Sequence, residues 1–229
     1  MAGSSATSFL KNQYWVLRHG RSIPNERGII ISNRVYGILP QYGLSSKGVQ
    51  QAASAGESFL RELKAKNIPL ENVRICYSPF SRTIHTAQVV ARVMNLPFDG
   101  PQFKVIEDLR ERKFGPTFEL QSHDKYPEIW DLDEKDPFLP PEGGESVANV
   151  ASRLANALAT IEAEFDGCVV LVVSHGDPLQ ILQTVIHTAM QETNGSKDIP
   201  SIINGVTTHS TLSQHRKFAL ATGELRLVT

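Results

Sequence analysis

Apolar residues along the chain follow two alternating patterns. Short apolar runs, which are typical of buried strands, occur at four places: QYWVL (13–17), VRICY (73–77), FKVI (103–106) and CVVLVVS (168–174). Between them, apolar residues recur at helical spacing in stretches that begin at Ser45, at Ser81, at Ser146 and near Pro178. Strands that alternate with helices in this way predict an α/β fold with a mainly parallel central sheet.

Local signals refine these elements. Ser45 is a suitable helix N-cap, and Pro178 suits a first helical turn. CVVLVVS is continuously apolar, so both of its faces are expected to be covered. Residues 114–144 are rich in proline, glycine and acids and are expected to be irregular. The tail KFALATGELRLV (217–228) is expected to form a hairpin that turns at its Thr-Gly pair.

The composition is that of an ordinary globular protein. Of the 229 residues, 41% are hydrophobic and 21% are charged, and the formal net charge is −1. We therefore expect one domain over residues 1–229, with a flexible segment at 1–12. This charge does not favour nucleic acid or an acidic membrane surface as a partner. No apolar run is long enough to span a membrane.

The two cysteines indicate the compartment. Cys76 and Cys168 both lie in apolar runs that are predicted to be strands. We expect them to be free, buried thiols, which are typical of a reducing compartment such as the cytoplasm.

Charged and polar residues directly follow each of the four predicted strands. In open α/β sheets, ligands bind beyond the carboxyl ends of the strands, so these residues are candidates for a shared site. They are Arg18, His19, Gly20 and Arg21 after the first strand, Arg82 after the second, Glu107, Glu111 and Arg112 after the third, and His175 and Gly176 after the fourth. Each motif alone is weak, since RHG is also compatible with an exposed turn. Their common position at one sheet edge favours a functional site.

Two kinds of side chain in this group indicate phosphate chemistry. Arginine guanidinium groups bind phosphate oxygens in pairs and stay charged at any working pH. A histidine among arginines is favoured in its neutral form, because neighbouring cations oppose its protonation. A neutral imidazole is a nucleophile toward phosphorus. The sequence has no HExxH motif, no clustered set of acids and histidines and no paired cysteines, so no metal or other cofactor is predicted.

Six motifs along the chain form a recognisable series. They are LRHG, GLSSKGVQQA, SPFSRTIHTA, LRERKFG, PPEGGES and VVSHG. In this order they resemble the motifs of the histidine phosphatase superfamily, which includes the cofactor-dependent phosphoglycerate mutases. The resemblance covers most of the chain and implies a three-layer α/β/α sandwich like that of the mutases.

The resemblance also implies a role for each candidate residue. His19 would accept the phosphoryl group. The groups expected to surround it are Arg18, Arg82 and His175. Glu111 would donate a proton to the leaving group, and Glu107 is the alternative acid. Asn25 would be a further contact. Arg21, which departs from the Glu, Gln or Thr that is common at this place in the family, is also expected to bind substrate, as are Arg112 and Gly176.

A phosphatase and a phosphoglycerate mutase would share this site. The mutases that the chain resembles carry a longer insertion with an arginine pair after LRERKFG, whereas residues 117–142 contain no arginine. That segment holds eight acids and two lysines, so as a lid it would repel a polyanionic substrate and favour hydrolysis. Alternatively, the acids only solvate a loop. His123 and Trp130 in this segment are interpreted as a surface residue and a packing residue.

The sequence thus predicts a metal-independent hydrolase of a small phosphorylated metabolite, acting through a phosphohistidine on His19. Three alternatives stay open: a cofactor-dependent mutase, a non-catalytic binder of phosphorylated ligands and a metal-dependent hydrolase.

Overall fold

The computed structural model describes residues 9–192 and 198–229. Most of the expected flexible segment, 1–12, lies outside these residues. Its described part is packed, because Leu10 and Asn12 are buried. The Asn12 side chain donates to Glu162 Oε1 (2.8 Å) and accepts from the backbone N of Cys168 (2.8 Å). Residues 9–12 are therefore anchored rather than flexible.

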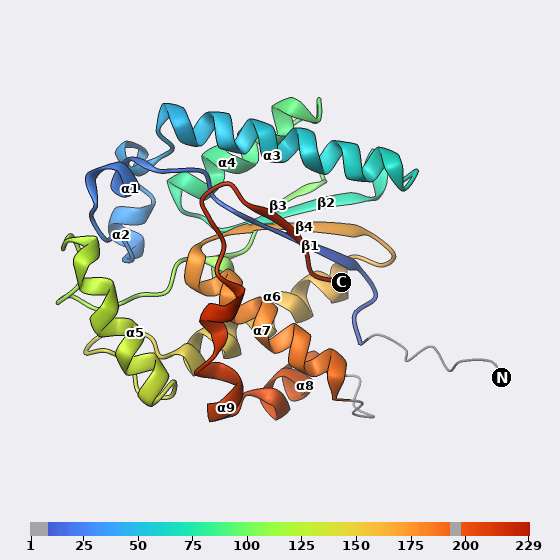
Figure 1. The fold of residues 1–229 in the computed structure, drawn as a ribbon. Coiled ribbons are helices and arrows are strands. Elements are labelled where there is room, and N and C mark those ends of the chain that lie inside the picture. Colours follow the sequence, from blue (N-terminus) through green and yellow to red (C-terminus); the bar gives the residue numbers. More distant parts are fainter. Residues whose placement is uncertain (1–8, 193–197) are drawn as a thin grey trace.

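A five-stranded sheet crosses the centre of the molecule in the order β3-β2-β4-β1-β5 (Figure 1). Its strands are β1 (Gln13–Arg18), β2 (Val73–Tyr77), β3 (Phe103–Val105), β4 (Val169–Ser174) and β5 (Leu225–Leu227). The first four pair in parallel, and β5 pairs antiparallel with β1. The sheet is therefore mixed and mainly parallel, as the alternation of strands and helices predicts.

Helices cover both faces of this sheet. In Figure 1, α3 and α4 lie on one face, and α6 and α7 lie on the other, with α8 and α9 beyond them. The helices are α1 (Ile23–Arg27), α2 (Arg34–Gly37), α3 (Ser46–Ala65), α4 (Ser81–Val93), α5 (Tyr126–Lys135), α6 (Val147–Glu164), α7 (Gly176–Gln191), α8 (Ile199–Val206) and α9 (His209–Leu212). Short 3-10 helices are η1 (Pro40–Tyr42), η2 (Leu70–Asn72), η3 (Glu107–Leu109), η4 (His123–Lys125) and η5 (His215–Phe218). The predicted three-layer α/β/α sandwich is confirmed.

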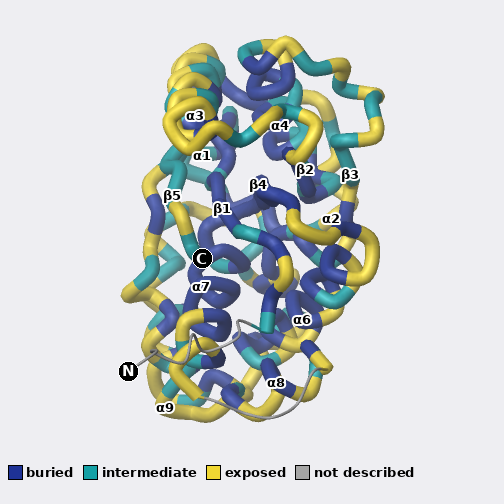
Figure 2. The backbone as a smooth tube through the Cα atoms, turned by 90° about the vertical axis from the view of Figure 1, so that its right-hand side faces the viewer, coloured by how far each residue is buried: buried dark blue, intermediate teal, exposed yellow. Residues whose placement is uncertain are grey.

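Side chains alternate across the central strands and fill two cores. On β1, Tyr14 and Val16 join the core that includes α6 and α7, whereas Trp15 and Leu17 join the core that includes α3 and α4. Every residue of β4 is buried. Because helices cover both faces of this strand, its sequence is continuously apolar rather than alternating. In Figure 2 the central strands are dark blue and the outer turns of α3 are yellow.

Most of the predicted elements are confirmed. The four apolar runs form β1 to β4, apart from one or two residues at their ends, and the four helical stretches form α3, α4, α6 and α7. Ser45 caps α3, since its hydroxyl accepts from the backbone N of Gly48 (3.3 Å). Cys76 and Cys168 are free and buried. Within the described ranges, no helix is long and apolar enough to cross a membrane.

Residues 114–144 are less irregular than expected. Helix α5 forms within them, with Pro127 in its first turn, and it buries Ile129 and Asp133. Proline has no backbone N–H, and the N–H groups of a first helical turn have no intrahelical acceptor. Proline therefore loses no hydrogen bond at this position. The proline that suggested a loop therefore marks the start of a helix.

The predicted C-terminal hairpin is wrong. β5 pairs with β1, and residues 215–218 form η5 instead of a strand. Gly223 still makes a turn with a φ of +74°, and its N–H is shared between the carbonyls of Arg18 and His19 (both 3.1 Å). An isolated two-stranded hairpin is marginally stable, whereas the free edge of β1 offers a place in a larger sheet. The tail is therefore hydrogen-bonded to β1 and to the start of the loop that follows it, at Arg18 and His19.

Candidate active site

The carboxyl ends of β1, β2 and β4 bring His19, Arg82 and His175 together. His19 follows β1, Arg82 lies in the first turn of α4, and His175 is the residue before α7. The Arg82 Nε hydrogen is shared between His19 Nε2 and His175 Nδ1, each 3.1 Å away. The two imidazole ring centroids are 5.3 Å apart. The predicted convergence at one sheet edge is therefore present for these three residues.

His19 is held as a neutral imidazole with a defined tautomer. Its Nδ1 lies 2.8 Å from the carbonyl oxygen of Gly20, which can only accept, so Nδ1 carries the hydrogen and Nε2 keeps its lone pair. Burial, followed by the charges of Arg82 and Arg18, lowers the pKa of His19 well below its ordinary value. Nε2 therefore stays unprotonated over the physiological pH range.

A close backbone approach supports this loop. A Cβ atom on Gly20 would lie 2.2 Å from the carbonyl oxygen of Gly48 at the start of α3. A Cβ on Gly48 would lie 2.0 Å from the carbonyl oxygen of Arg21. Both positions therefore require glycine, because any side chain would push α3 away from the loop that carries His19.

His175 is buried beside Arg82. Its Nε2 lies 2.8 Å from Ser78 Oγ, and its Nδ1 accepts from Arg82 Nε, so Nε2 carries the hydrogen. Burial, followed by the charge of Arg82, lowers the pKa of His175 well below its ordinary value. A neutral His175 can donate or accept at this position without adding charge.

Two buried guanidinium nitrogens have no acceptor among the described residues. They are Arg82 Nη1 and Arg18 Nε. The rest of the Arg82 group is held in place, since Nη2 donates to the carbonyl of Ile31 (3.1 Å) and to Glu111 Oε2 (3.3 Å). Buried donors normally have partners, and charged donors most of all. This pair is therefore suited to bind an anion next to His19.

Glu111 has the properties of a general acid. Its Oε1 accepts from the backbone N of Arg112 (3.0 Å). Burial raises the pKa of Glu111 to about 7, with Arg82 acting against the shift and Asp177 adding to it. Glu107, the alternative acid, forms an exposed ion pair with Arg34 (2.9 Å). Glu111 is thus the carboxyl group next to the arginines and histidines.

A cavity of about 360 Å³ opens beside Arg18 and Glu111. Of the predicted site residues, those that line it are Arg18, Arg21, Asn25, Glu111 and Gly176. His19, Arg82 and His175 do not line it and are buried behind Arg18 and Glu111. The Asn25 side chain is oriented by the hydroxyl of Ser22, which donates to its Oδ1 (2.8 Å). Arg21 is a half-exposed cation at this cavity, 4.0 Å from a carboxylate oxygen of Glu26.

Several lining residues were missed or misread at the sequence level. They are Phe114, His123, Tyr126, Trp130, Asp177, Gln180 and Arg216. Tyr126 and Trp130 lie one helical turn apart on α5, with ring centroids 5.8 Å apart and planes at 6°. Their i, i+4 spacing is a signal that could have placed them on one helix face. Nothing in the sequence near Arg216 indicates that it reaches this cavity.

Arg112 is not placed to bind substrate. Its side chain is completely buried, and it forms a two-pronged ion pair with Asp133 (2.6 and 2.7 Å). The same Nη1 donates to Asp177 Oδ2 (3.2 Å). Arg112 therefore supports α5 and Asp177 from behind the cavity, which corrects the expected role of this residue.

The acidic segment 117–142 does not present its charges to the cavity. None of its eight acids lines the cavity, and the side chains that it contributes there are His123, Tyr126 and Trp130. Glu119 accepts from the hydroxyl of Ser32 (2.6 Å), and Asp133 is paired with Arg112. Two of the eight acids are therefore engaged within the protein, and none of the eight lies at the cavity wall, so the wall gives no support to the charge argument against a polyanionic substrate.

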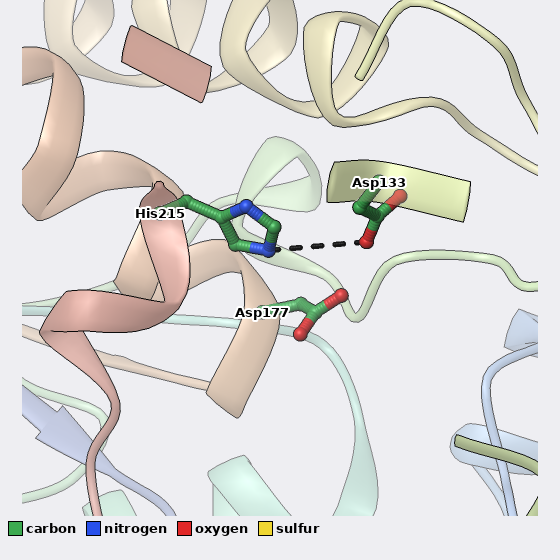
Figure 3. A group of neighbouring side chains, drawn as sticks. All are labelled: Asp133, Asp177 and His215. Carbon is green, nitrogen blue, oxygen red and sulfur yellow. Dashed lines mark ion pairs between the residues drawn. The ribbon is translucent and has the colours of Figure 1, made fainter. Parts of the chain in front are cut away.

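The fold also gathers an acid–histidine cluster that the sequence analysis did not find. In the described part of the chain, ligand atoms of Asp133, Asp177 and His215 lie within 4.8 Å of one another (Figure 3). His215 Nε2 is 3.9 Å from Asp133 Oδ2. However, Arg112 Nη1 already contacts both carboxylates. A metal ion would have to displace a buried guanidinium, so this cluster is better explained as an ion-pair network.

Removal of Asp133 is expected to destabilise the protein strongly. Asp133→Ala leaves the fully buried Arg112 guanidinium with a single carboxylate partner, and breaking a buried pair in this way typically costs about 3–5 kcal/mol. Urea unfolding followed by circular dichroism measures the free energy of unfolding. The control is Asp131→Ala, an exposed acid of the same helix, with an expected change of about 0.5 kcal/mol or less. Equal midpoints for the two variants would contradict the assignment.

Comparisons with known proteins agree with this geometry. The family model "Histidine phosphatase superfamily (branch 1)" matches residues 14–200. The chain is 29% identical over 171 residues to the bifunctional protein Rv2228c of Mycobacterium tuberculosis, covering 73% of this chain but only 42% of that protein. It therefore spans less than half the length of that relative.

Two further relatives are phosphatases by name. A metal-independent phosphoserine phosphatase of Arabidopsis thaliana is 27% identical over 198 residues, or 83% of this chain and 74% of that protein. The solved structure of mycobacterial glucosyl-3-phosphoglycerate phosphatase Rv2419c superposes with a TM-score of 0.57 and 25% identity, covering 83% of this chain and 84% of that one. Because the family model matches far more than half of the chain, including the residues around His19, this protein belongs to the histidine phosphatase superfamily.

Proposed function

We propose that this protein hydrolyses the phosphate monoester of a small metabolite through a phosphohistidine on His19. The observation that carries the proposal is the pair of buried guanidinium donors without acceptors, Arg82 Nη1 and Arg18 Nε. They lie beside a neutral imidazole whose Nε2 keeps its lone pair. Fixed positive charge next to a nucleophile is what phosphoryl transfer needs, since most of its catalysis is positioning and charge stabilisation.

The first step forms the phosphoenzyme. Bound phosphate oxygens would accept hydrogen bonds from Arg82 and Arg18, so that Arg82 Nε no longer needs His19 as its acceptor. The Nε2 lone pair attacks phosphorus, an N–P bond forms, and the P–O bond to the leaving group breaks. The Glu111 carboxyl transfers its proton to the departing oxygen, which leaves as an alcohol.

The second step restores the enzyme. The Glu111 carboxylate takes a proton from a water molecule, whose oxygen attacks phosphorus. The N–P bond breaks, its electron pair returns to Nε2 of His19, and inorganic phosphate leaves. Glu111 is again protonated and His19 is again neutral, so one residue serves as acid and then as base.

The relatives support the substrate class. The Arabidopsis protein is named for phosphoserine, and the mycobacterial structure is named for glucosyl-3-phosphoglycerate. Both substrates are phosphorylated metabolites, and the cavity of about 360 Å³ here suits a ligand of that kind. The cytoplasmic location that the free thiols suggest stays a prediction.

The activity is expected to be independent of metal ions, because arginine side chains supply the positive charge at the site. After exhaustive treatment with a chelator, the protein should release inorganic phosphate from p-nitrophenyl phosphate and from a panel of metabolites that includes 3-phosphoglycerate and phosphoserine. The rate should equal that of the untreated protein. A loss that magnesium or zinc restores would contradict the mechanism and direct attention to Asp133, Asp177 and His215.

Product analysis separates hydrolysis from transfer. With 3-phosphoglycerate as substrate, a phosphatase releases inorganic phosphate and glycerate. A mutase instead yields an isomeric phosphoglycerate, with little free phosphate. Formation of the isomer as the main product would replace the proposed hydrolase by a mutase that uses the same residues.

A further inference from the structure

We infer that Arg216, held against Trp130, binds a second anionic group on the leaving-group side of the substrate. The inference rests on the proposed hydrolysis of a phosphate monoester at His19. It narrows the substrate class to phosphate esters whose leaving group carries a carboxylate or another anion.

Arg216 reaches the cavity from the C-terminal part of the chain. It lies in η5, and its guanidinium carbon is 3.7 Å from the centroid of the Trp130 ring. Trp130 in turn stacks with Tyr126 (centroids 5.8 Å apart), and all three side chains line the cavity that also contains Glu111. A guanidinium over an aromatic face is attracted by the ring but keeps its full charge.

The segment that carries Arg216 is fastened to α5. His215 lies 3.9 Å from Asp133, the buried partner of Arg112. At the end of α5, His209 Nε2 is hydrogen-bonded to the carbonyl of Lys135 (2.9 Å). The segment that carries Arg216 is therefore positioned by contacts with the C-terminal half of α5, next to Trp130. A cation that is oriented before binding loses less side-chain entropy when it meets a ligand.

The charges around the cavity leave Arg216 available. Among the described residues, no carboxylate lies within ion-pair distance of Arg216, and its guanidinium contacts the Trp130 ring. The two acids that line the cavity have neighbours of opposite charge, since Asp177 contacts Arg112 and Glu111 contacts Arg82. The phosphate itself is matched by Arg18 and Arg82. The other cations that line the cavity are Arg21, which lies 4.0 Å from Glu26, and Arg216. A second anion is the ligand group that would complement Arg216.

The part of the cavity wall formed by Tyr126, Trp130 and Arg216 suits an anionic group of the ligand better than an aromatic ring. The Trp130 ring already contacts both Tyr126 and Arg216. The group that this part of the wall offers to a ligand is therefore a guanidinium, whose fork of donors matches a carboxylate or a phosphate. Gln180, which lines the same cavity, adds a neutral donor and acceptor.

Two pairs of substrates that differ in one carboxylate measure how much a second anionic group contributes to kcat/KM. 3-Phosphoglycerate differs from glycerol 3-phosphate by a carboxylate in place of a hydroxymethyl group, and phosphoserine differs from phosphoethanolamine by one carboxylate. The wild-type protein is expected to have the higher kcat/KM for the acidic member of each pair. Arg216→Gln should reduce that preference about tenfold, mainly through KM, because a charge-assisted hydrogen bond in a partly open site is worth about one factor of ten.

Matched variants separate local recognition from overall charge. Lys217→Gln removes the same charge at the next residue, which does not line this cavity, and it should keep the full preference. Arg216→Lys keeps the charge but loses the planar fork, so it should retain part of the preference. An equal loss of preference in Lys217→Gln and Arg216→Gln would overturn the inference.

A binding measurement makes the test independent of turnover. In a His19→Ala background, calorimetry should show tighter binding of 3-phosphoglycerate than of glycerol 3-phosphate, and adding Arg216→Gln should remove the difference. If the wild-type protein releases no phosphate from any ester, the proposed function fails while this comparison still decides the role of Arg216. If it hydrolyses esters but Arg216→Gln leaves both the rate ratio and the affinity ratio unchanged, only the inference fails.

Discussion

His19→Ala is expected to abolish turnover of every phosphate monoester, lowering kcat/KM by about 10⁴-fold or more. In the proposed mechanism the His19 imidazole forms the covalent intermediate, and the protonated arginines, which have no free lone pair, cannot replace it. Wild-type protein incubated with ³²P-labelled substrate and quenched in alkaline detergent should carry a label that stays bound in base and is released on later treatment with acid, as expected of a phosphoramidate. The variant should carry none.

Two histidine controls make this result specific. His187→Ala changes an exposed histidine of α7 that does not line the active-site cavity, and it should keep both label and rate. His175→Ala removes an acceptor of Arg82 and the partner of Ser78, so it should slow the reaction but leave the label on His19, the proposed nucleophile. Label that persists in His19→Ala and disappears in His175→Ala would move the nucleophile to His175.

Glu111→Gln is expected to slow alkyl phosphates by about 10²–10⁴-fold while affecting aryl phosphates much less. An alkoxide is a poor leaving group and needs a proton as the P–O bond breaks, whereas nitrophenolate scarcely does. The glutamine keeps the shape of the side chain but has no acidic proton. Formation of the phosphoenzyme must be followed by rapid quench, because Glu111 also assists the later attack of water.

The pH dependence gives a second readout for the same residue. Burial raises the pKa of Glu111 to about 7, so the carboxyl holds its proton below this pH and loses it above. The rate of phosphoenzyme formation from alkyl phosphates should therefore fall as the pH rises through about 7, and Glu111→Gln should lack this decline. Glu107→Gln, at the exposed ion pair with Arg34, should behave like the wild type. Equal slowing of alkyl and aryl esters by Glu111→Gln would limit Glu111 to support of the cavity.

The convergence of His19, Arg82 and His175 could be predicted from the sequence because of a general property of parallel sheets. Each residue follows an apolar run that is too short for a helix and is flanked by helical stretches. Parallel strands end at the same sheet edge, so residues directly after them meet without any knowledge of side-chain contacts. The neutral state of His19 could be predicted for a similar reason, since two arginines lie next to it in sequence or at that edge.

The role of Arg112 could not be predicted in this way. It is adjacent to Glu111 in sequence, and an arginine at a phosphate site is reasonably expected to bind substrate. Its direction depends on Asp133, which lies in a helix that the sequence analysis interpreted as irregular. A side chain next to a catalytic residue can point to either side of the backbone, and only its packing decides which.

The residues that form the outer wall of the cavity could not be predicted from the sequence either. Tyr126 and Trp130 depend on the formation of α5, and Arg216 depends on the path of a tail that was expected to be a hairpin. Contacts within the protein also explain why two acids of 117–142 turn away from the cavity, since Asp133 pairs with Arg112 and Glu119 accepts from Ser32.

The sequence by itself determined the layered α/β fold, the sheet edge that carries the site and the chemistry of its reactive groups. These follow from hydrophobic periodicity and from residues placed directly after strands, both of which are local properties of the chain. The tertiary structure alone decided which cations line the cavity, which are neutralised by buried carboxylates, and which residues form the outer wall of the cavity. Those choices depend on contacts between segments up to about a hundred residues apart, such as Trp130 with Arg216 and Arg112 with Asp177, and their energies arise only when the chain has folded and removed these groups from water.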